Sequence, residues 1–307
     1  MPELPEVETI RLGLEKYLVG SPRGGALLGH KIKGVDVRLK KVVTGDTANV
    51  IGSHVKSVRR FGKALSIDLD NGWSITVHIK LTGQLVYRGQ EVSKVGKVPE
   101  VSNVLTGGEL PNKWTHVIFH LDRDGNLYYN DVRQFGWIKI IPTKDVESLP
   151  FIHELGPEPP VVNFDTPVYQ SEKKVLTLGK FREIIKNKKT KIKPLLMDQK
   201  KIGGVGNIYA NDALFLAGID PGRRAGMLSG NEAMKLYRAI GTVLRRGLKY
   251  GGATEMNFVN ALGQPGGYQE HFLVYGREGE KCRECGGIIK KIRLGGRGTY
   301  YCPRCQH

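Results

Sequence analysis

Four cysteines in the last 26 residues constrain the C-terminal part of this chain more than any other feature. Cys282, Cys285, Cys302 and Cys305 form the pattern C-x2-C-x16-C-x2-C. Two C-x2-C turns bring two pairs of thiolates together, as in a closed tetrahedral zinc site. Two disulfides are the alternative, but a chain without a secretory signal favours a reducing compartment and therefore zinc. Four cysteines leave no open coordination position, so we expect one structural Zn²⁺ without a catalytic role.

The segment between the two cysteine pairs, GGIIKKIRLGGRGTYY, predicts a β-hairpin. Two short strands flank a glycine-rich turn from Leu294 to Gly298. We therefore expect a zinc finger whose hairpin presents Arg297 near its tip.

The charge of the chain indicates a polyanionic partner. Lysine and arginine number 47 against 30 acidic residues, which gives a formal net charge of +17. Nucleic acid is the favoured partner, and a membrane surface or a merely solvated basic surface are the alternatives. Eleven basic residues and only two acids lie between Lys173 and Lys201, and this clustering favours a nucleic-acid surface. No apolar segment approaches the roughly 20 residues that a membrane-spanning helix requires.

Hydrophobic periodicity divides the chain into a β-rich half and a helical half. From about Lys31 to Ile141, short alternating segments predict an antiparallel sandwich or barrel: KALSIDLD, SITVHIKLTGQLVY, THVIFHLD and NLYYNDV. Within this half, Glu91 to Lys113 is a long polar loop without a readable role. Six prolines in the 26 residues after Ile141 indicate an extended linker. Helical periodicity follows in FREIIKN, IKPLLMDQ, NIYANDALFLAG and NEAMKLYRAIGTVLRRGLKY.

The N-terminal sequence MPELPEVE predicts the start of a helix and not a targeting segment. A signal peptide would begin with basic residues, whereas the first fifteen residues contain Glu3, Glu6, Glu8 and Glu15 against a single Arg11. Proline is favoured in the first turn of a helix and so are acidic residues. We therefore expect a helix that continues through VETIRLGLEKYL.

The glycine-rich sequence GGVGN precedes a predicted helix whose start we expect Asn207 to cap. Glycines allow the backbone to approach a ligand closely, and a helix N-terminus binds phosphate well. A tight turn between packed helices is the alternative. The basic segment that precedes the glycines favours the phosphate site.

Taken in order, the motifs of this chain resemble those of the formamidopyrimidine-DNA glycosylase family: MPELPEVE, FGKALSI, HIKLTG, DVRQFG, LGPEP, GGVGNIYANDALF, VYGREGEKC and GGRGTYYCPRCQ. These bifunctional enzymes excise oxidised purines such as 8-oxoguanine. The resemblance covers the whole length and implies an α+β fold with double-stranded DNA in a cleft between the two halves. The expected domains are an N-terminal catalytic antiparallel β-sandwich with a leading helix (1–141), a linker (142–168), a helix-two-turns-helix DNA-binding domain (169–270) and a C-terminal zinc finger (271–307).

The start of the chain has the residues for covalent catalysis. Removal of Met1 would expose the secondary amine of Pro2, whose pKa of about 8 leaves on the order of a tenth of it unprotonated at neutral pH. This amine can attack C1′ of a damaged nucleotide and expel the base. The resulting iminium cannot lose its charge by deprotonation and therefore promotes elimination of the flanking phosphates. The resemblance implies that Glu3 protonates the sugar ring oxygen and that Glu6 orients the amine and the helix start.

The resemblance also implies which residues bind the phosphates around the extruded nucleotide. Lys63, His78, Asn207 and Arg297 match these positions, and Lys63 is counted among the catalytic residues. Without the resemblance, Lys63 and His78 would be interpreted as solvated strand residues. Lys193 is a further candidate for a phosphate contact.

A base must leave the duplex before C1′ can be attacked, and the space it vacates must be filled. By resemblance, Arg133 faces the orphaned cytosine and Phe135 enters the base stack. The third position is usually methionine, but this chain has Leu81 in HIKLTG. Leucine keeps the apolar character of methionine, but its side chain is stiffer.

The resemblance also implies a loop that covers the flipped purine, and this chain retains it at about Asn257 to Tyr268. Its Gly and Pro content leaves few side chains to pack and exposes backbone N–H groups, which suits recognition of a purine carbonyl edge. A disordered connector is the alternative. We count Tyr268 among the lesion-contacting candidates. Sister enzymes of the endonuclease VIII type, which prefer oxidised pyrimidines, generally lack this loop, so purines are favoured.

We therefore expect a monomeric DNA repair glycosylase with abasic-site lyase activity, located in the cytoplasm at the nucleoid. Its partner would be double-stranded DNA with oxidised bases or abasic sites, and no membrane. An endonuclease VIII-like glycosylase for oxidised pyrimidines is one alternative. The other is a zinc-finger DNA-binding protein without catalysis, which would follow if Met1 were retained and blocked the amine.

Overall fold

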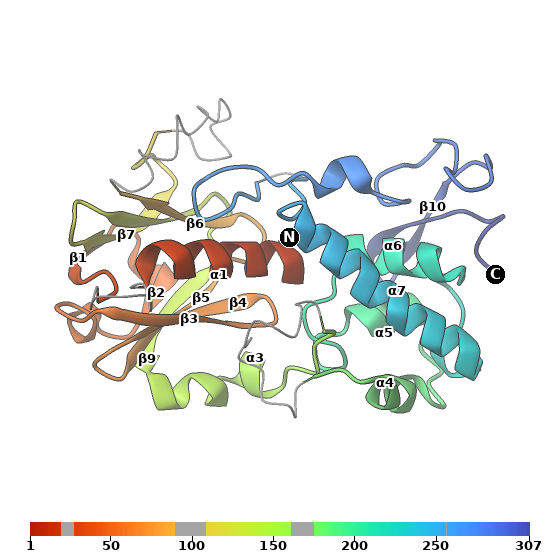
Figure 1. The fold of residues 1–307 in the computed structure, drawn as a ribbon, viewed down its shortest axis with the longest axis horizontal. Coiled ribbons are helices and arrows are strands. Elements are labelled where there is room, and N and C mark those ends of the chain that lie inside the picture. Colours follow the sequence, from red (N-terminus) through yellow and green to blue (C-terminus); the bar gives the residue numbers. More distant parts are fainter. Residues whose placement is uncertain (20–27, 90–108, 161–174, 256) are drawn as a thin grey trace. The chain divides into compact units, whose positions relative to one another are not determined.

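The computed structural model describes residues 1–19, 28–89, 109–160, 175–255 and 257–307, and these form two compact units (Figure 1). The sandwich unit comprises Met1–His153 and Tyr250–Gln269, and the helical unit comprises Glu154–Lys249 and Glu270–His307. Most of the polar loop predicted at Glu91 to Lys113 lies outside the described residues, as do residues 161–168 of the predicted linker. Among the helices that are described, none is long and apolar enough to cross a bilayer.

The sandwich unit begins with helix α1 (Leu4–Leu18), which confirms the predicted leading helix. Pro5 lies in its first turn, where a missing N–H breaks no hydrogen bond within the helix. Val7, Ile10 and Leu14 recur every three or four residues and are fully buried. This apolar stripe packs on strand β3, where Val58 belongs to the same core cluster.

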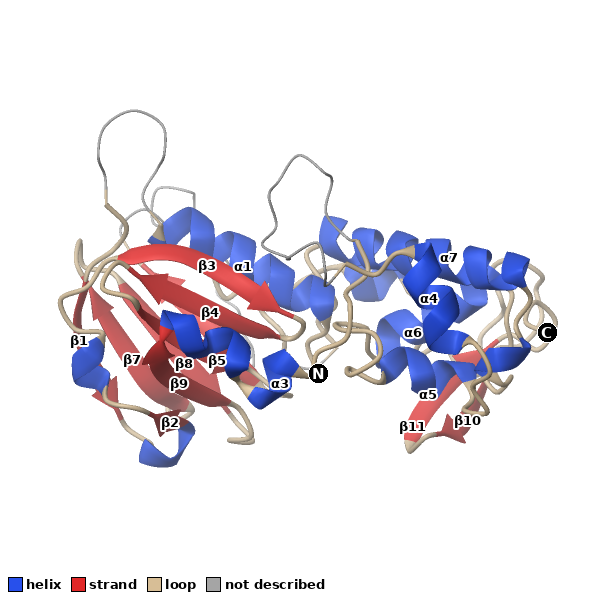
Figure 2. Cartoon of the chain, turned by 90° about the horizontal axis from the view of Figure 1, so that it is seen from below, coloured by secondary structure: helices blue, strands red, loops and turns tan. Residues whose placement is uncertain are grey.

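Two sheets form the sandwich, which confirms the predicted architecture. One sheet has the strand order β1-β7-β8-β6 and the other β2-β9-β5-β4-β3; within them only the short β2–β9 pairing is parallel. Figure 2 shows β3, β4, β5 and β9 side by side in one layer. The strands are β1 (Ile32–Val37), β2 (Val43–Thr44), β3 (Val55–Phe61), β4 (Ala64–Leu69), β5 (Trp73–His78), β6 (Gly83–Arg88), β7 (Thr115–Leu121), β8 (Asn126–Asp131) and β9 (Trp137–Pro142), with short helical turns η1 (Lys40–Val42) and η2 (Thr47–Asn49).

The alternating segment SITVHIKLTGQLVY forms two strands in different sheets. A tight turn over residues 79–82 separates β5 from β6, and it is closed by the Gly83 N–H, which donates to the Ile79 carbonyl at 2.8 Å. A Cβ at Gly83 would lie 2.4 Å from that carbonyl oxygen, so the chain can turn this tightly only with glycine here.

Two connections cross from one sheet to the other at the same end of the sandwich. The turn 79–82 leads from β5 to β6, and residues 132–136 lead from β8 back to β9. His78 of β5 pairs with Trp137 of β9 where these strands of the five-stranded sheet meet the connections. Gly83 of β6 pairs with Asp131 of β8 at the corresponding place in the four-stranded sheet. The two connections therefore lie side by side.

The structure corrects two predicted domain boundaries. The first concerns the linker, because residues 143–153 fold as η3 (Thr143–Ser148) and α3 (Pro150–His153) within the sandwich unit. Val146 and Ile152 are fully buried, and the Phe151 ring contacts Trp137 with 4.8 Å between ring centroids. Proline is favoured both in a first helical turn and in an extended linker. Because Val146 and Ile152 are buried in the sandwich unit, residues 143–153 form helical turns here.

The second correction concerns Tyr250–Gln269, which we predicted as the end of the helical domain and which belongs to the sandwich unit. Phe258 and Ala261 are part of the sandwich core. The Tyr87 N–H of β6 donates to the Ala261 carbonyl at 2.7 Å. The glycine and proline content of this segment is typical of a loop, so its composition does not indicate that Phe258 and Ala261 are buried.

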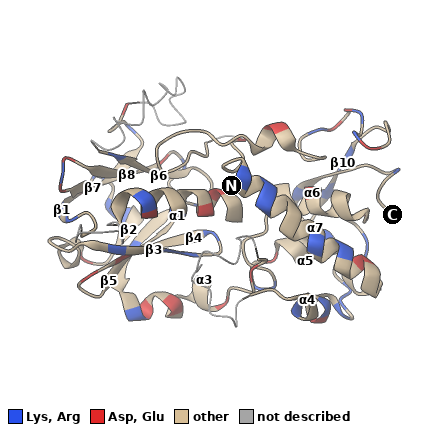
Figure 3. Ribbon diagram, in the orientation of Figure 1, with Lys and Arg blue, Asp and Glu red and all other residues tan. Residues whose placement is uncertain are grey.

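The helical unit contains the four predicted helices and the predicted hairpin. Helix α7 buries Leu236, Ile240 and Val243 on one face, while Lys and Arg occur along it in Figure 3. Of the eleven basic residues between Lys173 and Lys201, two are not described and, of the other nine, only Lys193 is buried. The elements are α4 (Leu178–Ile185), α5 (Ile192–Met197), α6 (Asn207–Ala217), η5 (Ala225–Met227), α7 (Gly230–Lys249), β10 (Lys290–Leu294) and β11 (Arg297–Tyr301), and η6 (Tyr268–His271) lies at the border of the two units.

Candidate active site and nucleic-acid contacts

The two carboxyl groups predicted for catalysis lie buried at the N-terminus of α1. Glu3 is 3% exposed and Glu6 is 1% exposed. The Glu3 N–H donates to Glu6 Oε2 at 2.8 Å, and the Ala253 N–H donates to Glu6 Oε1 at 2.7 Å. The N-terminus of a helix also stabilises negative charge. Glu6 is therefore held by two backbone donors, and it orients the residue that follows Pro2.

Gly252 allows the segment after α7 to approach Glu6. Its φ of +83° lies in the left-handed region, and a Cβ there would lie 2.9 Å from Glu6 Cγ. Sequence reasoning missed this contact, although the adjacent glycines in GGATE were an available signal. Pro2 is buried beside Glu3, whereas Met1 is 45% exposed. Removal of Met1 would leave the amine of Pro2 next to a buried carboxyl group.

Lys63 and His78 lie in the same sandwich unit, at the turn between β3 and β4 and at the end of β5. The Lys80 N–H donates to His78 Nδ1 at 3.1 Å, which leaves the ring proton on Nε2. Burial, followed by the charges of Lys80 and Lys63, lowers the pKa of His78 to about 3. His78 is thus a neutral hydrogen-bond donor near two lysines, an arrangement suited to a phosphate.

The predicted void-filling residues come together on the two crossing connections. Leu81 is half-buried in the turn 79–82, while Arg133 and Phe135 are exposed in the connection 132–136. The guanidinium carbon of Arg133 lies 4.8 Å from the centroid of the Phe135 ring, and this ring is 58% exposed. An exposed aromatic side chain beside a cation is suited to contact stacked bases.

Asn207 has a different local role from the one we predicted. Helix α6 begins at Asn207 and its N-cap is Gly206, so the prediction that Asn207 caps the helix is wrong. The Asn207 side chain instead accepts a hydrogen bond from Lys193 Nζ at 2.7 Å. Pairing with a buried ammonium group competes with capping because a capping oxygen must face the helix N–H groups.

Lys193 connects Asn207 to the hairpin of the zinc finger. The lysine is fully buried, and its Nζ also donates to the Gly298 carbonyl at 2.9 Å and to Thr299 Oγ1 at 2.7 Å. An ammonium group has three protons, and these three oxygens accept them. In this conformation the ammonium group of Lys193 is bound within the protein, and its predicted phosphate contact stays a prediction. Lys193 positions Asn207 beside the strand that begins with the exposed Arg297.

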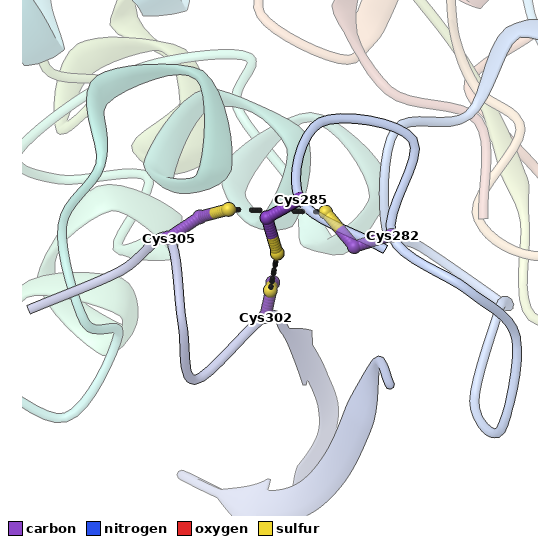
Figure 4. Close-up of side chains that lie close together, drawn as sticks. All are labelled: Cys282, Cys285, Cys302 and Cys305. Carbon is purple, nitrogen blue, oxygen red and sulfur yellow. Dashed lines mark hydrogen bonds between the residues drawn. The ribbon is translucent and has the colours of Figure 1, made fainter. Parts of the chain in front are cut away.

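The four cysteines converge as the spacing predicts (Figure 4). Their sulfurs all lie within 4.8 Å of one another, with 3.8 Å between Cys282 and Cys305 and 3.5 Å between Cys285 and Cys302. These distances exclude disulfides and match the roughly 3.8 Å between sulfurs in a tetrahedral zinc site. The Gly287 N–H donates to Cys285 Sγ, and this hydrogen bond is the largest cause that lowers the pKa of the Cys285 thiol to about 7. The donor set fits one structural Zn²⁺.

The loop from Asn257 to Tyr268 differs from the prediction in two respects. Phe258, Val259, Ala261 and Tyr268 are buried, so the loop has side chains to pack. Its backbone N–H groups are also used within the unit, with donors at residues 260, 262, 263, 264, 266, 267 and 268. In this conformation the loop is part of the sandwich. Recognition of a base by these N–H groups would require their present hydrogen bonds to open.

Comparison with known proteins decides the family. The model of the formamidopyrimidine-DNA glycosylase N-terminal domain matches residues 1–138, that of the family's H2TH domain matches 155–258, and that of a zinc finger found in FPG and IleRS matches 279–307. The formamidopyrimidine-DNA glycosylase of Pelotomaculum thermopropionicum is 38% identical over 100% of this chain and 99% of its own length. The chain belongs to the formamidopyrimidine-DNA glycosylase family. The same enzyme of Desulforamulus reducens is 36% identical, over 100% of this chain and 99% of its own.

Solved structures of formamidopyrimidine-DNA glycosylases agree with this assignment. A Lactococcus lactis FPG mutant in complex with a Fapy-dG containing DNA has a TM-score of 0.80 and 31% identity, with 100% of both chains covered. MutM (FPG) from Thermus thermophilus has a TM-score of 0.79 and 32% identity, over 99% of this chain and 98% of its own. The predicted α+β fold with β-sandwich, helix-two-turns-helix domain and zinc finger is thereby confirmed.

Proposed function

We propose that this chain is a bifunctional DNA glycosylase and abasic-site lyase that acts on oxidised purines in double-stranded DNA. One observation carries the proposal: the buried Glu3 adjoins Pro2 at the start of α1, where Glu6 holds the backbone through the Glu3 N–H. Relatives of the same family have been solved with DNA that contains Fapy-dG or an abasic site, which supports the substrate class. We place the enzyme at the nucleoid as a monomer.

The amine of Pro2, exposed by removal of Met1, attacks C1′ of the extruded nucleotide. The bond from its nitrogen to C1′ forms and the glycosidic bond breaks. The base leaves with the bonding electrons and takes up the proton that the nitrogen loses. Glu3 gives a proton to the sugar ring oxygen, which opens the ring and leaves an iminium at C1′. Glu6 remains a carboxylate that holds the backbone of Glu3.

Strand cleavage follows from the iminium, which accepts electrons. Loss of a proton from C2′ expels the 3′ phosphate, and a second loss at C4′ expels the 5′ phosphate, which is β,δ-elimination. Hydrolysis of the iminium then returns Pro2 as a free amine. No external oxidant or reductant is needed because each step moves only protons and leaving groups.

Cationic and donor side chains of each unit bind the DNA backbone. In the sandwich unit these are Lys63 and the neutral His78, and in the helical unit they are Asn207 and Arg297. The structural Zn²⁺ stabilises the hairpin that carries Arg297. We infer that Arg133, Phe135 and Leu81 occupy the space left by the flipped base.

The experiment that tests the proposal is borohydride reduction with a duplex that contains 8-oxoguanine. The intact mass first establishes that Met1 has been removed. Borohydride should then trap an adduct that maps to Pro2, because reduction turns the iminium into a stable amine. A lesion-free duplex and the Glu3→Gln variant are the controls, and both should yield little adduct. An adduct at a lysine, or none with the Met1-free protein, would overturn the mechanism.

Oxidised pyrimidines are the second candidate substrate, and two observations favour keeping them. The wild-type Lactococcus lactis FPG has been solved with an oxidized pyrimidine containing DNA, at 31% identity and a TM-score of 0.79 to this chain. In addition, the N–H groups predicted to read a purine are used within the sandwich unit. Single-turnover excision of 8-oxoguanine and of an oxidised pyrimidine in matched duplexes distinguishes the two. Faster excision of the oxidised pyrimidine would show that pyrimidines, and not purines, are the preferred substrates.

A further inference from the structure

The two connections that carry the void-filling side chains meet at one buried carboxylate. Asp131 is the last residue of β8 and is fully buried. Its Oδ1 accepts from the Thr82 hydroxyl at 2.5 Å and from the Arg133 N–H at 3.2 Å. Its Oδ2 accepts from the Gly136 N–H at 2.8 Å and from the Tyr129 hydroxyl at 3.3 Å. Each oxygen of Asp131 therefore has two donors, of which Thr82 lies in one connection and Arg133 and Gly136 lie in the other.

Thr82 joins the two connections a second time. Its hydroxyl donates to Asp131 and accepts from the Arg133 N–H at 2.9 Å. Thr82 directly follows Leu81, so this hydrogen bond ties the turn 79–82 to the start of the connection 132–136. We call Thr82, Asp131 and the Arg133 and Gly136 backbone N–H groups the carboxylate clamp.

The backbone in both connections is held in an unfavourable conformation. Lys80 has a φ of +49° and Gln134 a φ of +55°, in the left-handed region that residues other than glycine rarely adopt. Each directly precedes an apolar void-filling residue, Leu81 in one case and Phe135 in the other. Such conformations persist only where the surroundings enforce them, and they cluster at functional sites.

The clamp also leaves no space for the second connection to shift. A Cβ at Gly136 would lie 2.1 Å from the Tyr129 hydroxyl oxygen and 2.8 Å from the His78 carbonyl oxygen. The His116 ring contacts the Asp131 backbone carbonyl through Nε2 at 2.7 Å. The connection is thus packed from both sheets, while the Phe135 side chain remains exposed.

We propose that Asp131 is a positioning residue that presets Leu81, Arg133 and Phe135 for insertion into the base stack. The inference rests on the proposed glycosylase function. Insertion of ordered side chains spares the conformational entropy that flexible turns would lose on binding DNA. A carboxylate is needed because all four partners are donors, and an asparagine would direct its own NH₂ at one of them.

The test compares Asp131→Asn with Asp68→Asn. Asp68 is a buried carboxylate of the other sheet, 5% exposed, whose Oδ1 accepts from the Ser66 and Ser74 hydroxyls. It is the matched control because no void-filling residue depends on it. We expect Asp131→Asn to lower single-turnover excision of 8-oxoguanine about tenfold, the effect of losing one hydrogen bond to a charged group. Asp68→Asn should leave it within about twofold.

Cleavage at abasic sites provides the internal comparison. Extrusion costs least where no intact base pair has to be broken. Asp131→Asn should therefore lower abasic-site cleavage much less than excision. A 2-aminopurine next to an abasic-site analogue reports insertion without chemistry, and its fluorescence change on binding should be smaller for Asp131→Asn than for Asp68→Asn.

Conservative variants of Thr82 separate positioning from stability. Thr82→Ser keeps the hydroxyl and should excise at close to the wild-type rate, whereas Thr82→Val keeps the shape and should behave like Asp131→Asn. Because both residues belong to one network, Asp131→Asn combined with Thr82→Val should cost less than the product of the single effects. Thermal unfolding establishes that each variant is folded.

Equal loss of excision and abasic-site cleavage in Asp131→Asn and Asp68→Asn would overturn the inference, because the carboxylate would then only stabilise the sandwich. Wild-type rates in Asp131→Asn would overturn it as well. Failure of the proposed function has a different signature, since the wild-type protein itself would then neither excise 8-oxoguanine nor cleave abasic sites.

Discussion

The Ala253 N–H donates to Glu6 Oε1 at 2.7 Å, a hydrogen bond between residues 247 positions apart in the sequence. It brings the segment after α7 to the N-terminus of α1, and both belong to the sandwich unit. The other oxygen of Glu6 accepts from the Glu3 N–H. The Glu6 carboxylate thus links Ala253, in the segment after α7, to Glu3, the residue next to the proposed nucleophile Pro2.

Gly252→Ala tests this connection. An added Cβ would lie 2.9 Å from Glu6 Cγ at a backbone φ of +83°, so we expect Glu6 to move and excision to fall. Gly72→Ala is the matched control, because its φ is +81° but a Cβ there meets nothing within 4 Å. The control should lose about 1 kcal/mol of unfolding free energy from backbone strain alone and retain its excision rate. Excision rates are measured in single turnover. Equal rates in the two variants would show that Glu6 can move away from the added Cβ without an effect on excision.

His78 should give the stability of the protein a specific pH dependence. Its pKa is lowered from 6.5 in an unperturbed chain to about 3 in the folded protein, by burial first and then by Lys80 and Lys63. Between these values the unfolded chain binds a proton here and the folded protein does not, so the unfolding free energy falls as pH falls. His78→Gln removes this contribution. Urea unfolding at pH 7, 5.5 and 4.5 should show a flatter dependence in the variant, and an unchanged slope would contradict the assignment.

Lys193→Met should separate Asn207 from the hairpin of the zinc finger. The variant leaves the Asn207, Gly298 and Thr299 oxygens without their shared ammonium donor, so we expect weaker binding of an abasic-site duplex by about tenfold or more. Lys200→Met removes the same charge from an exposed side chain and is the control. Affinities of both variants at several salt concentrations decide the question. A loss equal to that of Lys200→Met would mean that Lys193 contributes only charge.

Removal of the metal should abolish DNA binding while the sandwich unit remains folded. Cys302 is fully buried in a small cluster with Phe215, Val274 and Ile289, and the thiolates must converge for this cluster to form. Chelation or Cys302→Ser should therefore unfold the hairpin that carries Arg297. Arg297→Ala should reproduce most of the binding loss with zinc still bound. Zinc content, circular dichroism and duplex affinity measured together check this, and unchanged affinity in Arg297→Ala would show that its side chain does not contact DNA.

Features encoded by neighbouring residues were predictable from the sequence. The cysteine spacing specified the metal site because each C-x2-C pair is a local turn. The start of α1 was readable from Pro5 and Glu6, since proline and acidic groups stabilise the first helical turn. The hairpin between the cysteine pairs followed from its turn glycines and flanking strand residues. Family resemblance supplied the remaining site residues, and their roles stay predictions.

Contacts between distant segments required the folded protein. Nothing near Lys193 in the sequence indicates that its ammonium is enclosed by Asn207 and the finger hairpin, and a basic segment made a phosphate contact the natural expectation. Residues 257–268 were interpreted as an open loop because glycine and proline outweigh Phe258 and Ala261 in composition. Burial of these two side chains depends on the two sheets and on α1, which lie more than 110 positions earlier in the sequence.

Asp131 shows the physical reason for this difference. Backbone preferences act over a few residues, so a helix start can be recognised from a short motif such as MPELPEVE. The partners of a buried carboxylate are set by strand pairing, here Gly83 with Asp131 and His78 with Trp137, which places two separate connections side by side. Pairing of strands is selected by the packing of the entire core, and no local pattern specifies it.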